Sequence, residues 1–160
     1  NLIGKDRDAI PVSFNASVFR NSEGAVEGII AAARDIRDMR RMMAELEQSR
    51  NYARGLIESS LDLMVTIGRD GLITDVNQEA ERLTGVTREQ LIGSYFRGYF
   101  TEPGAAQAGV DRTFAEGRVK NYRLVLRTHP DRTAPVSFNA SLYCDQAGAP
   151  IGIFAVAREI

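Results

Sequence analysis

Residue types that carry out chemistry are scarce in this sequence. Its 160 residues include one histidine, His129, and one cysteine, Cys144. A zinc site needs three or four protein ligands, so one histidine cannot supply a metal site alone. The sequence also lacks a Gly-x-Ser-x-Gly elbow, a phosphate-binding glycine loop after a strand, and a His/Cys/Asp cluster at metal-ligand spacing. We therefore expect a chain that is not an enzyme and has no catalytic or metal-binding residues.

The single cysteine also bears on the location of the protein. Cys144 cannot form an internal disulfide, which agrees with a reducing cytoplasm. It falls at the end of a predicted strand beside a turn, where a half-buried, unreactive thiol is expected and redox sensing is the less favoured alternative.

Charge and hydropathy exclude two classes of partner. Twenty basic and twenty-one acidic side chains give a net charge of -1, which provides no broad positive surface for nucleic acid or anionic lipid. No apolar run approaches the roughly twenty residues of a membrane span. We expect no nucleic-acid partner and no membrane contact.

A chain of this length is expected to form one complete domain and part of another.

An internal repeat organises the chain. The segment PVSFNASVFRNSEGAVEGIIAAARDI at 11–36 recurs as PVSFNASLYCDQAGAPIGIFAVAREI at 135–160, with 15 of 26 positions identical. Unrelated segments would share roughly one or two. Each copy has two apolar runs around a turn, which predicts a β-hairpin. Because only the second copy follows enough new sequence to complete a domain, residues 1–36 are predicted to be the last strands of a truncated first repeat.

The segment between the two copies predicts a helical connector over residues 37–56. Its apolar residues alternate at spacings of three and four, the heptad pattern of a two-stranded coiled coil. A helix of about 25 residues would extend roughly 37 Å. Arg50 and Ser60 would be weak members of this seam, and one amphipathic helix lying on its own domain is the alternative. The predicted seam residues are Ile36, Met39, Met43, Leu46, Ala53 and Ile57.

Residues 57–160 predict a complete α+β domain. The runs LMVTI and LITDV flank a turn at 69–71. Asn77 is placed to cap a first short helix, Thr87 and Gln90 have capping-box spacing for a second, and a longer helix follows. Three more strands are predicted, over 119–127, 134–144 and 150–157. This order predicts a five-stranded antiparallel sheet with short helices on one face.

This domain resembles a PAS domain. The resemblance rests on the segment LIESSLDLMVTIGRDGLITDVNQEAERLTGVTREQLIG at 56–93 and on the tail at 135–160. ARDI at 33–36 resembles the motif at which PAS domains continue into a signalling helix, with Arg37 where Thr is usual. The resemblance implies a PAS fold in the tandem sensory region of a bacterial histidine kinase or a related multidomain signalling protein. Its most specific pieces are the Asp70-Gly71 turn, the Val76-Asn77 step, Leu83-Thr84-Gly85 and Glu89-x-Leu91-x-Gly93.

The resemblance also implies that haem and flavin are the cofactors whose binding residues should be sought in this chain. Haem-binding relatives use a histidine on the long helix, but residues 104–116 contain none and His129 falls in a turn. Flavin photoreceptors of the family form an adduct with a cysteine after the Asn-capped helix, where this chain reads REQLIGSYFRGYF. No cofactor is predicted, and a noncovalent flavin or a small apolar ligand stays open.

An apolar cleft between helices and sheet is the candidate binding site. The alternative is that the same side chains fill a packed core, which we favour because a domain of about 100 residues has little apolar surface to spare. The aromatic cluster at 95–100 could gate such a cleft or simply pack. The candidate residues are Val65, Ile67, Leu83, Val110, Phe114, Leu124, Phe138, Leu142 and Phe154.

The expected function is sensing a signal and relaying it through the connecting helix, together with dimerisation. The alternative is a ligand-free dimerisation and spacing module. The expected partners are the adjacent PAS and output domains and a second copy of the chain, bound through the connector and the N-terminal hairpin. That hairpin is expected to present one apolar face, made of Val12, Phe14, Ile29 and Ile30, that must be covered.

Overall fold

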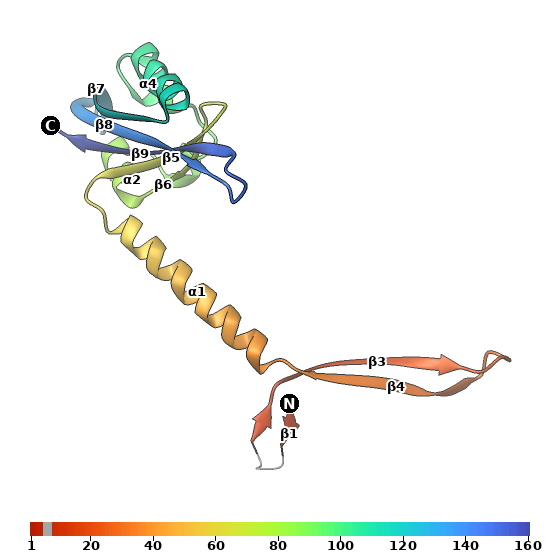
Figure 1. The fold of residues 1–160 in the computed structure, drawn as a ribbon. Coiled ribbons are helices and arrows are strands. Elements are labelled where there is room, and N and C mark those ends of the chain that lie inside the picture. The colour runs from red at the N-terminus through yellow and green to blue at the C-terminus, as the bar shows by residue number, and fades with distance from the viewer. Residues whose placement is uncertain (5–7) are drawn as a thin grey trace. The chain divides into compact units, whose positions relative to one another are not determined.

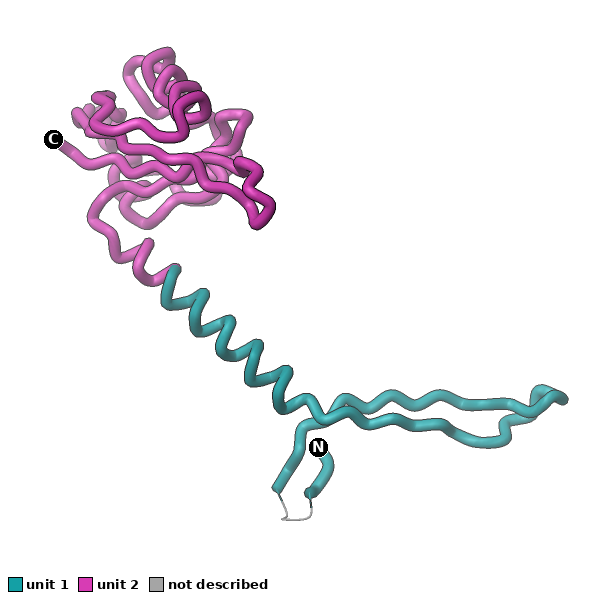
Figure 2. The backbone as a smooth tube through the Cα atoms, viewed as in Figure 1, with its two compact units in different colours: residues 1–53 teal, residues 54–160 magenta. Residues whose placement is uncertain are grey.

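The structure, a computed structural model, describes residues 1–4 and 8–160 and divides into two compact units (Figure 2). Unit 1 comprises residues 1–53 and unit 2 comprises residues 54–160. Each unit builds its own antiparallel sheet structure.

Unit 1 consists of two antiparallel strand pairs followed by most of a long helix (Figure 1). The longer pair is closed by a turn in which the Asn21 side chain accepts hydrogen bonds from the backbone N–H groups of Glu23 and Ala25, both at 3.0 Å. Large apolar side chains of this hairpin are exposed on both faces. The strands are β1 (Leu2–Ile3), paired with β2 (Ala9–Ile10), and β3 (Val12–Arg20), paired with β4 (Val26–Asp35).

Helix α1 (Arg37–Glu58) forms the connector and continues from unit 1 into unit 2. It is three residues shorter than the expected 25, and Ile36 and Ser60 lie just outside it. At its start, Asp35 accepts hydrogen bonds from the backbone and side chain of Arg37, and these contacts lower the pKa of the Asp35 carboxyl. No residue of α1 is buried. Within the described residues, no helix combines the length and the apolar character that crossing a membrane requires.

Unit 2 contains a five-stranded antiparallel sheet in the order β6-β5-β9-β8-β7. The predicted fold class is therefore confirmed, and each of the three late strands agrees with its prediction to within two residues. The strands are β5 (Leu63–Gly68), β6 (Ile73–Val76), β7 (Arg118–Thr128), β8 (Arg132–Cys144) and β9 (Pro150–Glu159).

Short helices separate β6 from β7 and cover one face of the sheet (Figure 1). Asn77 caps the first of them as predicted, because its side chain accepts a hydrogen bond from the N–H of Ala80. Gly85 and Gly117 end the first and last helices in the left-handed conformation, with φ of 69° and 82°. The helices are α2 (Gln78–Thr84), α3 (Arg88–Leu91), the 3₁₀ helix η1 (Phe96–Tyr99) and α4 (Pro103–Glu116).

The core lies between this helical layer and one face of the sheet. In β5 burial alternates strictly, so Leu63, Val65 and Ile67 face the helices. The helices contribute buried residues to the same cluster, among them Leu91 and Val110.

Candidate functional site

The predicted cleft residues are mostly packed in this core. Five of the nine are buried and three more are partly buried against the same cluster. Aromatic rings close the space between the layers: the ring centre of Phe96 lies 4.8 Å from that of Phe100 and 5.5 Å from that of Phe138. The buried five are Val65, Ile67, Val110, Leu124 and Phe138, and the partly buried three are Leu83, Phe114 and Leu142.

A small cavity remains between the sheet and the helices, with a volume of about 20 Å³. Val65 is the predicted residue that lines it, together with core residues such as Leu91 and Phe100. A single water molecule needs roughly 10–15 Å³, so this cavity has room for about one water.

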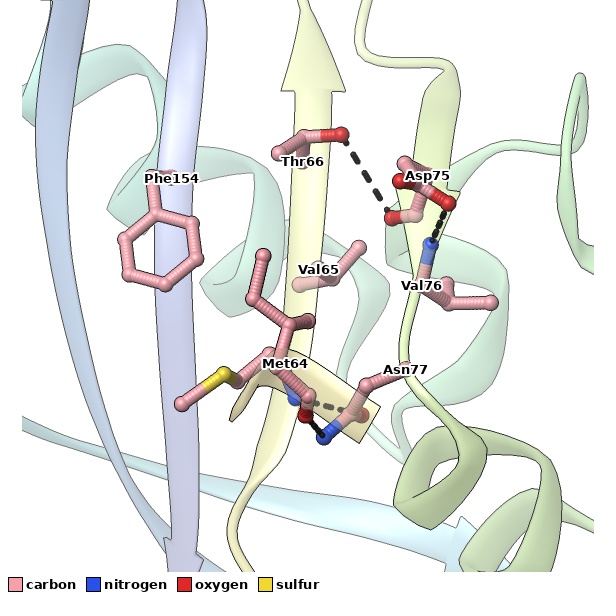
Figure 3. A pocket seen from close by; sticks show the side chains of 8 residues that line it. Met64, Val65, Thr66, Asp75, Val76, Asn77 and Phe154 are labelled. Carbon is pink, nitrogen blue, oxygen red and sulfur yellow. Dashed lines mark hydrogen bonds between the residues drawn. The ribbon is translucent and has the colours of Figure 1, made fainter. Parts of the chain in front are cut away.

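Phe154 does not belong to the cleft, and this part of the prediction is wrong. Its neighbours Ile153 and Ala155 are both fully buried under the helices, so Phe154 points to the opposite face of the sheet. There it lines a hollow of about 80 Å³ with Met64 and Thr66 (Figure 3).

Of two other predicted positions, Cys144 and His129, only the first differs in environment. Cys144 is exposed at the end of β8, not half-buried. His129 lies in a turn as expected, where its N–H donates to the carbonyl oxygen of Leu83 at 3.1 Å. Within the residues that the structure describes, no three His, Cys, Asp or Glu side chains lie close enough to hold a metal ion.

A group of four charged side chains, which we call the junction cluster, lies within unit 2, where the last turn of α1 contacts β6 and α3. It consists of Arg54 and Glu58 from α1, Asp75 from β6 and Arg88 from α3. Arg54 donates to Asp75 at 2.6 Å and pairs with Glu58; Arg88 donates to Glu58 at 3.2 Å and pairs with Asp75. Each carboxylate therefore contacts both guanidinium groups, and the four charges cancel. The side chains are 30–39% exposed, so water screens these pairs less than fully exposed ones.

The junction cluster also binds backbone groups. Glu58 accepts a hydrogen bond from the N–H of Gln78 at 2.7 Å, at the start of α2. Arg54 donates to the carbonyl oxygen of Val76 at 3.2 Å. A carboxylate at a helix N-terminus and an arginine at a backbone carbonyl oxygen are both favourable placements. The end of α1 is thereby tied to β6, α2 and α3 together.

Asn77 provides a second connection at the same place. Its side-chain amide donates to the carbonyl oxygens of Ile57 at 3.3 Å and Asp62 at 2.9 Å. Its side-chain oxygen accepts from the N–H groups of Met64 at 2.9 Å and Ala80 at 3.2 Å. Figure 3 shows this side chain directed at the Met64 backbone. One buried residue thus joins the end of α1, the following loop, β5 and α2.

A third connection joins the two ends of the domain. Arg158, near the end of β9, donates two parallel hydrogen bonds to Asp62 in the loop before β5, at 3.0 and 2.6 Å. These bonds hold the pKa of the Asp62 carboxyl below its ordinary value of 3.8, and the same contact raises the pKa of Arg158.

Sequence reasoning did not identify the junction cluster. Its members are spread over residues 54–88 and come together only after β6 and α3 are placed. One signal was present: Arg54 and Glu58 have the i, i+4 spacing of a helical ion pair. Among the described residues no group of three side chains is placed to hold a metal ion, and the junction cluster connects the end of α1 to β6 and α3.

Comparison with known proteins places these features in a family. The sequence model of the family described as "PAS fold" matches residues 57–160, and that of the family described as "PAS domain" matches residues 1–38. No curated protein matches the chain.

Solved structures show the same fold at low sequence identity. A PAS domain from Colwellia psychrerythraea has 18% identity and a TM-score of 0.60, covering 72% of this chain and 97% of its own. The PAS domain of an HTR-like protein from Haloarcula marismortui has 22% identity and a TM-score of 0.61, covering 76% and 99%. A PAS domain from a two-component sensor histidine kinase has 18% identity and a TM-score of 0.61, covering 71% and 98%.

Proposed function

The chain belongs to the PAS family of signal-sensing domains, and we propose that unit 2 relays a signal along helix α1 to neighbouring domains of the same protein. The proposal assigns no catalytic step to this chain and no haem or cysteinyl flavin to the domain. It also includes association with a second copy through α1.

The junction cluster is the observation that carries this proposal. It fastens the last turns of α1 to three elements of unit 2, while no residue along the helix is buried. A change in how β6, α2 or α3 packs would alter these charge contacts and so shift the end of the helix. A relay needs two arrangements that differ by a few kcal/mol, and half-buried, hydrogen-bonded charges can supply differences of that size.

The packing of the core bears on the kind of stimulus. A cavity of about 20 Å³ favours a stimulus that repacks the domain, such as a neighbouring domain or a very small molecule, over a bound chromophore. An apolar ligand larger than a few atoms would first have to displace core side chains.

The alternative function is a spacer that only holds two copies together. It is favoured by the exposed apolar residues of α1, which include Met43 at 63% and Leu46 at 72% exposure. A spacer uses the helix surface but has no need of the contacts that join α1 to β6 and α3.

The substitution Asp75→Asn separates the two functions. We expect amide hydrogens in the last turn of α1 to exchange about fivefold to tenfold faster, because loss of the carboxylate charge weakens both arginine contacts by about 1 kcal/mol. Amides of β8 and β9 should keep their exchange rates, which shows that the fold is intact. Hydrogen exchange read by mass spectrometry or NMR measures both sets.

A matched control removes an ion pair elsewhere. Arg112→Gln deletes the exposed pair between Arg112 and Glu116 on α4 and should leave exchange in α1 unchanged. If Asp75→Asn also makes the β8 and β9 amides exchange faster, the fold itself is disturbed. Glu58→Gln then tests the same cluster from the helix side. Unchanged exchange at the end of α1 in both cluster variants would contradict the relay and favour the spacer.

A further inference from the structure

The sheet of unit 2 has a second face, on the side away from the helices, which we call the outer face. Its residues lie at alternate positions of the strands, and the strand registers align them across the sheet. Arg118 of β7 pairs with Ser141 of β8, which in turn pairs with Phe154 of β9. Further along, Ser137 pairs with Arg123. Because Phe154 points to the outer face, the residues aligned with it point there as well.

Each of these three strands contributes its own kind of side chain to the outer face. Strand β8 contributes mainly hydroxyl and amide groups, and β9 contributes the apolar side chains of Phe154 and Val156. Strand β7 contributes four basic side chains, all exposed, which we call the basic row. The basic row consists of Arg118, Lys120, Arg123 and Arg127.

Within the described residues, no member of the basic row pairs with a carboxylate. The carboxylates beside the outer face are already occupied, since Asp75 contacts Arg54 and Arg88, and Asp62 contacts Arg158. Unit 2 has twelve basic and thirteen acidic side chains. Four of the twelve therefore lie in one row whose charge the domain does not neutralise, and like charges this close together repel one another.

A shallow hollow beside the basic row adds an apolar surface to it. The hollow has a volume of about 340 Å³ and extends from β7 across β8 to β9. Basic, hydrogen-bonding and apolar groups therefore meet in one place, a combination of arginine and aromatic side chains that is typical of protein interfaces. The residues that line the hollow include Arg118, Lys120, Asn139, Ser141, Phe154 and Val156.

We propose that the basic row and this hollow bind an acidic segment of another protein, which lies along β7 with carboxylates at alternate positions and an apolar side chain over Phe154. Successive outward positions of a strand are about 7 Å apart, and alternate side chains of an extended segment have the same spacing. Three carboxylates can then reach Arg118, Lys120 and Arg123, and each arginine can hold one by two parallel hydrogen bonds. The surface is separate from the junction cluster, so the inference goes beyond the relay.

Nucleic acid and anionic lipid are weaker candidates for this surface. The basic row is one side chain wide on a domain with an excess of acidic side chains, so a long polyanion would meet negative charge on either side of it. A short acidic segment contacts the row alone.

A second copy of the chain is also a weaker candidate. It has no free carboxylate to offer from its own outer face, because Asp62 and Asp75 are paired with arginines. Helix α1 carries five arginines and four acidic residues, so it does not complement the basic row either.

Fluorescence anisotropy with a labelled synthetic peptide tests the proposal. The peptide has about ten residues, with glutamates at alternate positions and two leucines at one end, and a second peptide has serines in place of the leucines. With the 160-residue chain we expect saturable binding of the first peptide. The binding should weaken as the salt concentration rises from about 50 to about 200 mM, because salt screens exposed charges.

Substitutions in the chain identify the surface. Arg118→Glu with Arg123→Glu should weaken binding at least about tenfold, because two attractive contacts become repulsive. Arg69→Glu with Arg97→Glu makes the same change in net charge at exposed positions outside the basic row, and should change the affinity by less than about twofold. If the first double variant fails to fold, as judged by circular dichroism, Arg118→Gln with Arg123→Gln tests the same two contacts and should weaken binding about threefold or more.

The hollow is tested separately. Phe154→Ala should weaken binding of the leucine peptide about threefold or more and leave binding of the serine peptide unchanged, because only leucine contacts the ring.

Several results would overturn the proposal: no saturable binding of the leucine peptide, equal effects of the two glutamate double variants, or equal effects of Phe154→Ala on both peptides. Tighter binding of single-stranded DNA or of phosphatidylserine vesicles than of the peptide would assign the basic row to a different class of partner. A lower mass of Arg118→Glu with Arg123→Glu than of wild type in sedimentation velocity would likewise overturn the proposal, in favour of a second copy.

Discussion

Asn77 shows how one side chain can fix the start of this domain. Its amide is 1% exposed, and both its donor and its acceptor sides are used in hydrogen bonds. An apolar residue of the same size would leave the carbonyls of Ile57 and Asp62 without these bonds, and an aspartate would place negative charge against them. The cap at Asn77 was predictable, since it follows from one residue and the helix after it. Its bonds to Ile57 and Asp62 were not, because they depend on where α1 ends.

The pair between Asp62 and Arg158 makes stability depend on acidity. The folded pKa of Asp62 lies below its ordinary value of 3.8, so the stabilisation is complete above that value and is lost as the pH falls through the folded pKa. We expect Asp62→Asn to lower the free energy of unfolding at pH 7 by less than about 1 kcal/mol, because Arg158 is largely exposed. Urea unfolding at a series of pH values measures the difference.

The difference between wild type and Asp62→Asn should shrink to nothing in the strongly acid range, where the carboxyl is protonated in both states. Glu89→Gln, which neutralises an exposed carboxylate on α3, serves as the control and should produce no comparable change at pH 7. A difference that persisted in strong acid would show that Asp62 acts through packing and not through its charge.

At the scale of elements, helix ends and hairpins could be predicted from local sequence. Which residues of β9 point toward the helices could not. In β9 the residues that point inward are Ile153, Ala155 and Ala157, while the larger Phe154 and Val156 point outward. Ranking by hydrophobicity would turn Phe154 and Val156 inward, whereas the buried face of β9 carries two alanines. The same reversal occurs in the first copy: Ile30 pairs with Ser17 as Phe154 pairs with Ser141, so it lies on the face opposite Phe14, and its predicted place beside Phe14 is wrong.

The turn between β7 and β8 packs against the end of α2, and glycine makes this contact possible. Gly85 has φ of 69°, and an added Cβ would lie 2.3 Å from the Cβ of His129. We expect Gly85→Ala to destabilise the domain by about 1–3 kcal/mol, from the left-handed conformation and the steric conflict together. Thermal unfolding followed by circular dichroism measures the shift.

A second glycine-to-alanine substitution serves as the control, because it replaces a glycine that has no such contact. Gly104 lies in the first turn of α4 with open space around it, so Gly104→Ala should be neutral or stabilise by up to about 1 kcal/mol. Equal melting temperatures for Gly85→Ala and wild type would mean that the turn moves away without cost, contrary to the contact described.

At the scale of the whole molecule, the exposed seam of α1 leads to a prediction about assembly. Met39, Met43 and Leu46 are 52–72% exposed, and Met42 and Leu56 beside them widen the apolar stripe. Heptad spacing predicts the seam residues and does not include their exposed neighbours Met42 and Leu56. Such a stripe on a helix without buried residues is typical of a surface that pairs with another helix.

We expect the chain to be a dimer in solution and the double substitution Met43→Glu with Leu46→Glu to make it monomeric. Two buried carboxylates per helix would repel each other and cost more than the apolar contact they replace. Sedimentation velocity over a range of concentrations gives the mass.

The control for assembly places the same charges on the opposite side of the helix. Arg41→Glu with Gln48→Glu lies away from the seam, at equivalent heptad positions, and should leave the dimer in place. A wild-type chain that stays monomeric at high concentration would exclude α1 as a dimer interface and leave the relay to act within one chain.

The matching ends of the two repeats have a consequence for how such proteins evolve. The N–H of Ile36 donates to the carbonyl of Pro11 and that of Ile160 to the carbonyl of Pro135, so both copies finish with the same backbone geometry. When a gene segment that encodes one such unit is duplicated, the residues that end its last strand are duplicated with it. New sensory units can then be added in series without a new interface having to arise, and natural selection can diversify their stimuli while the mechanical connection stays constant.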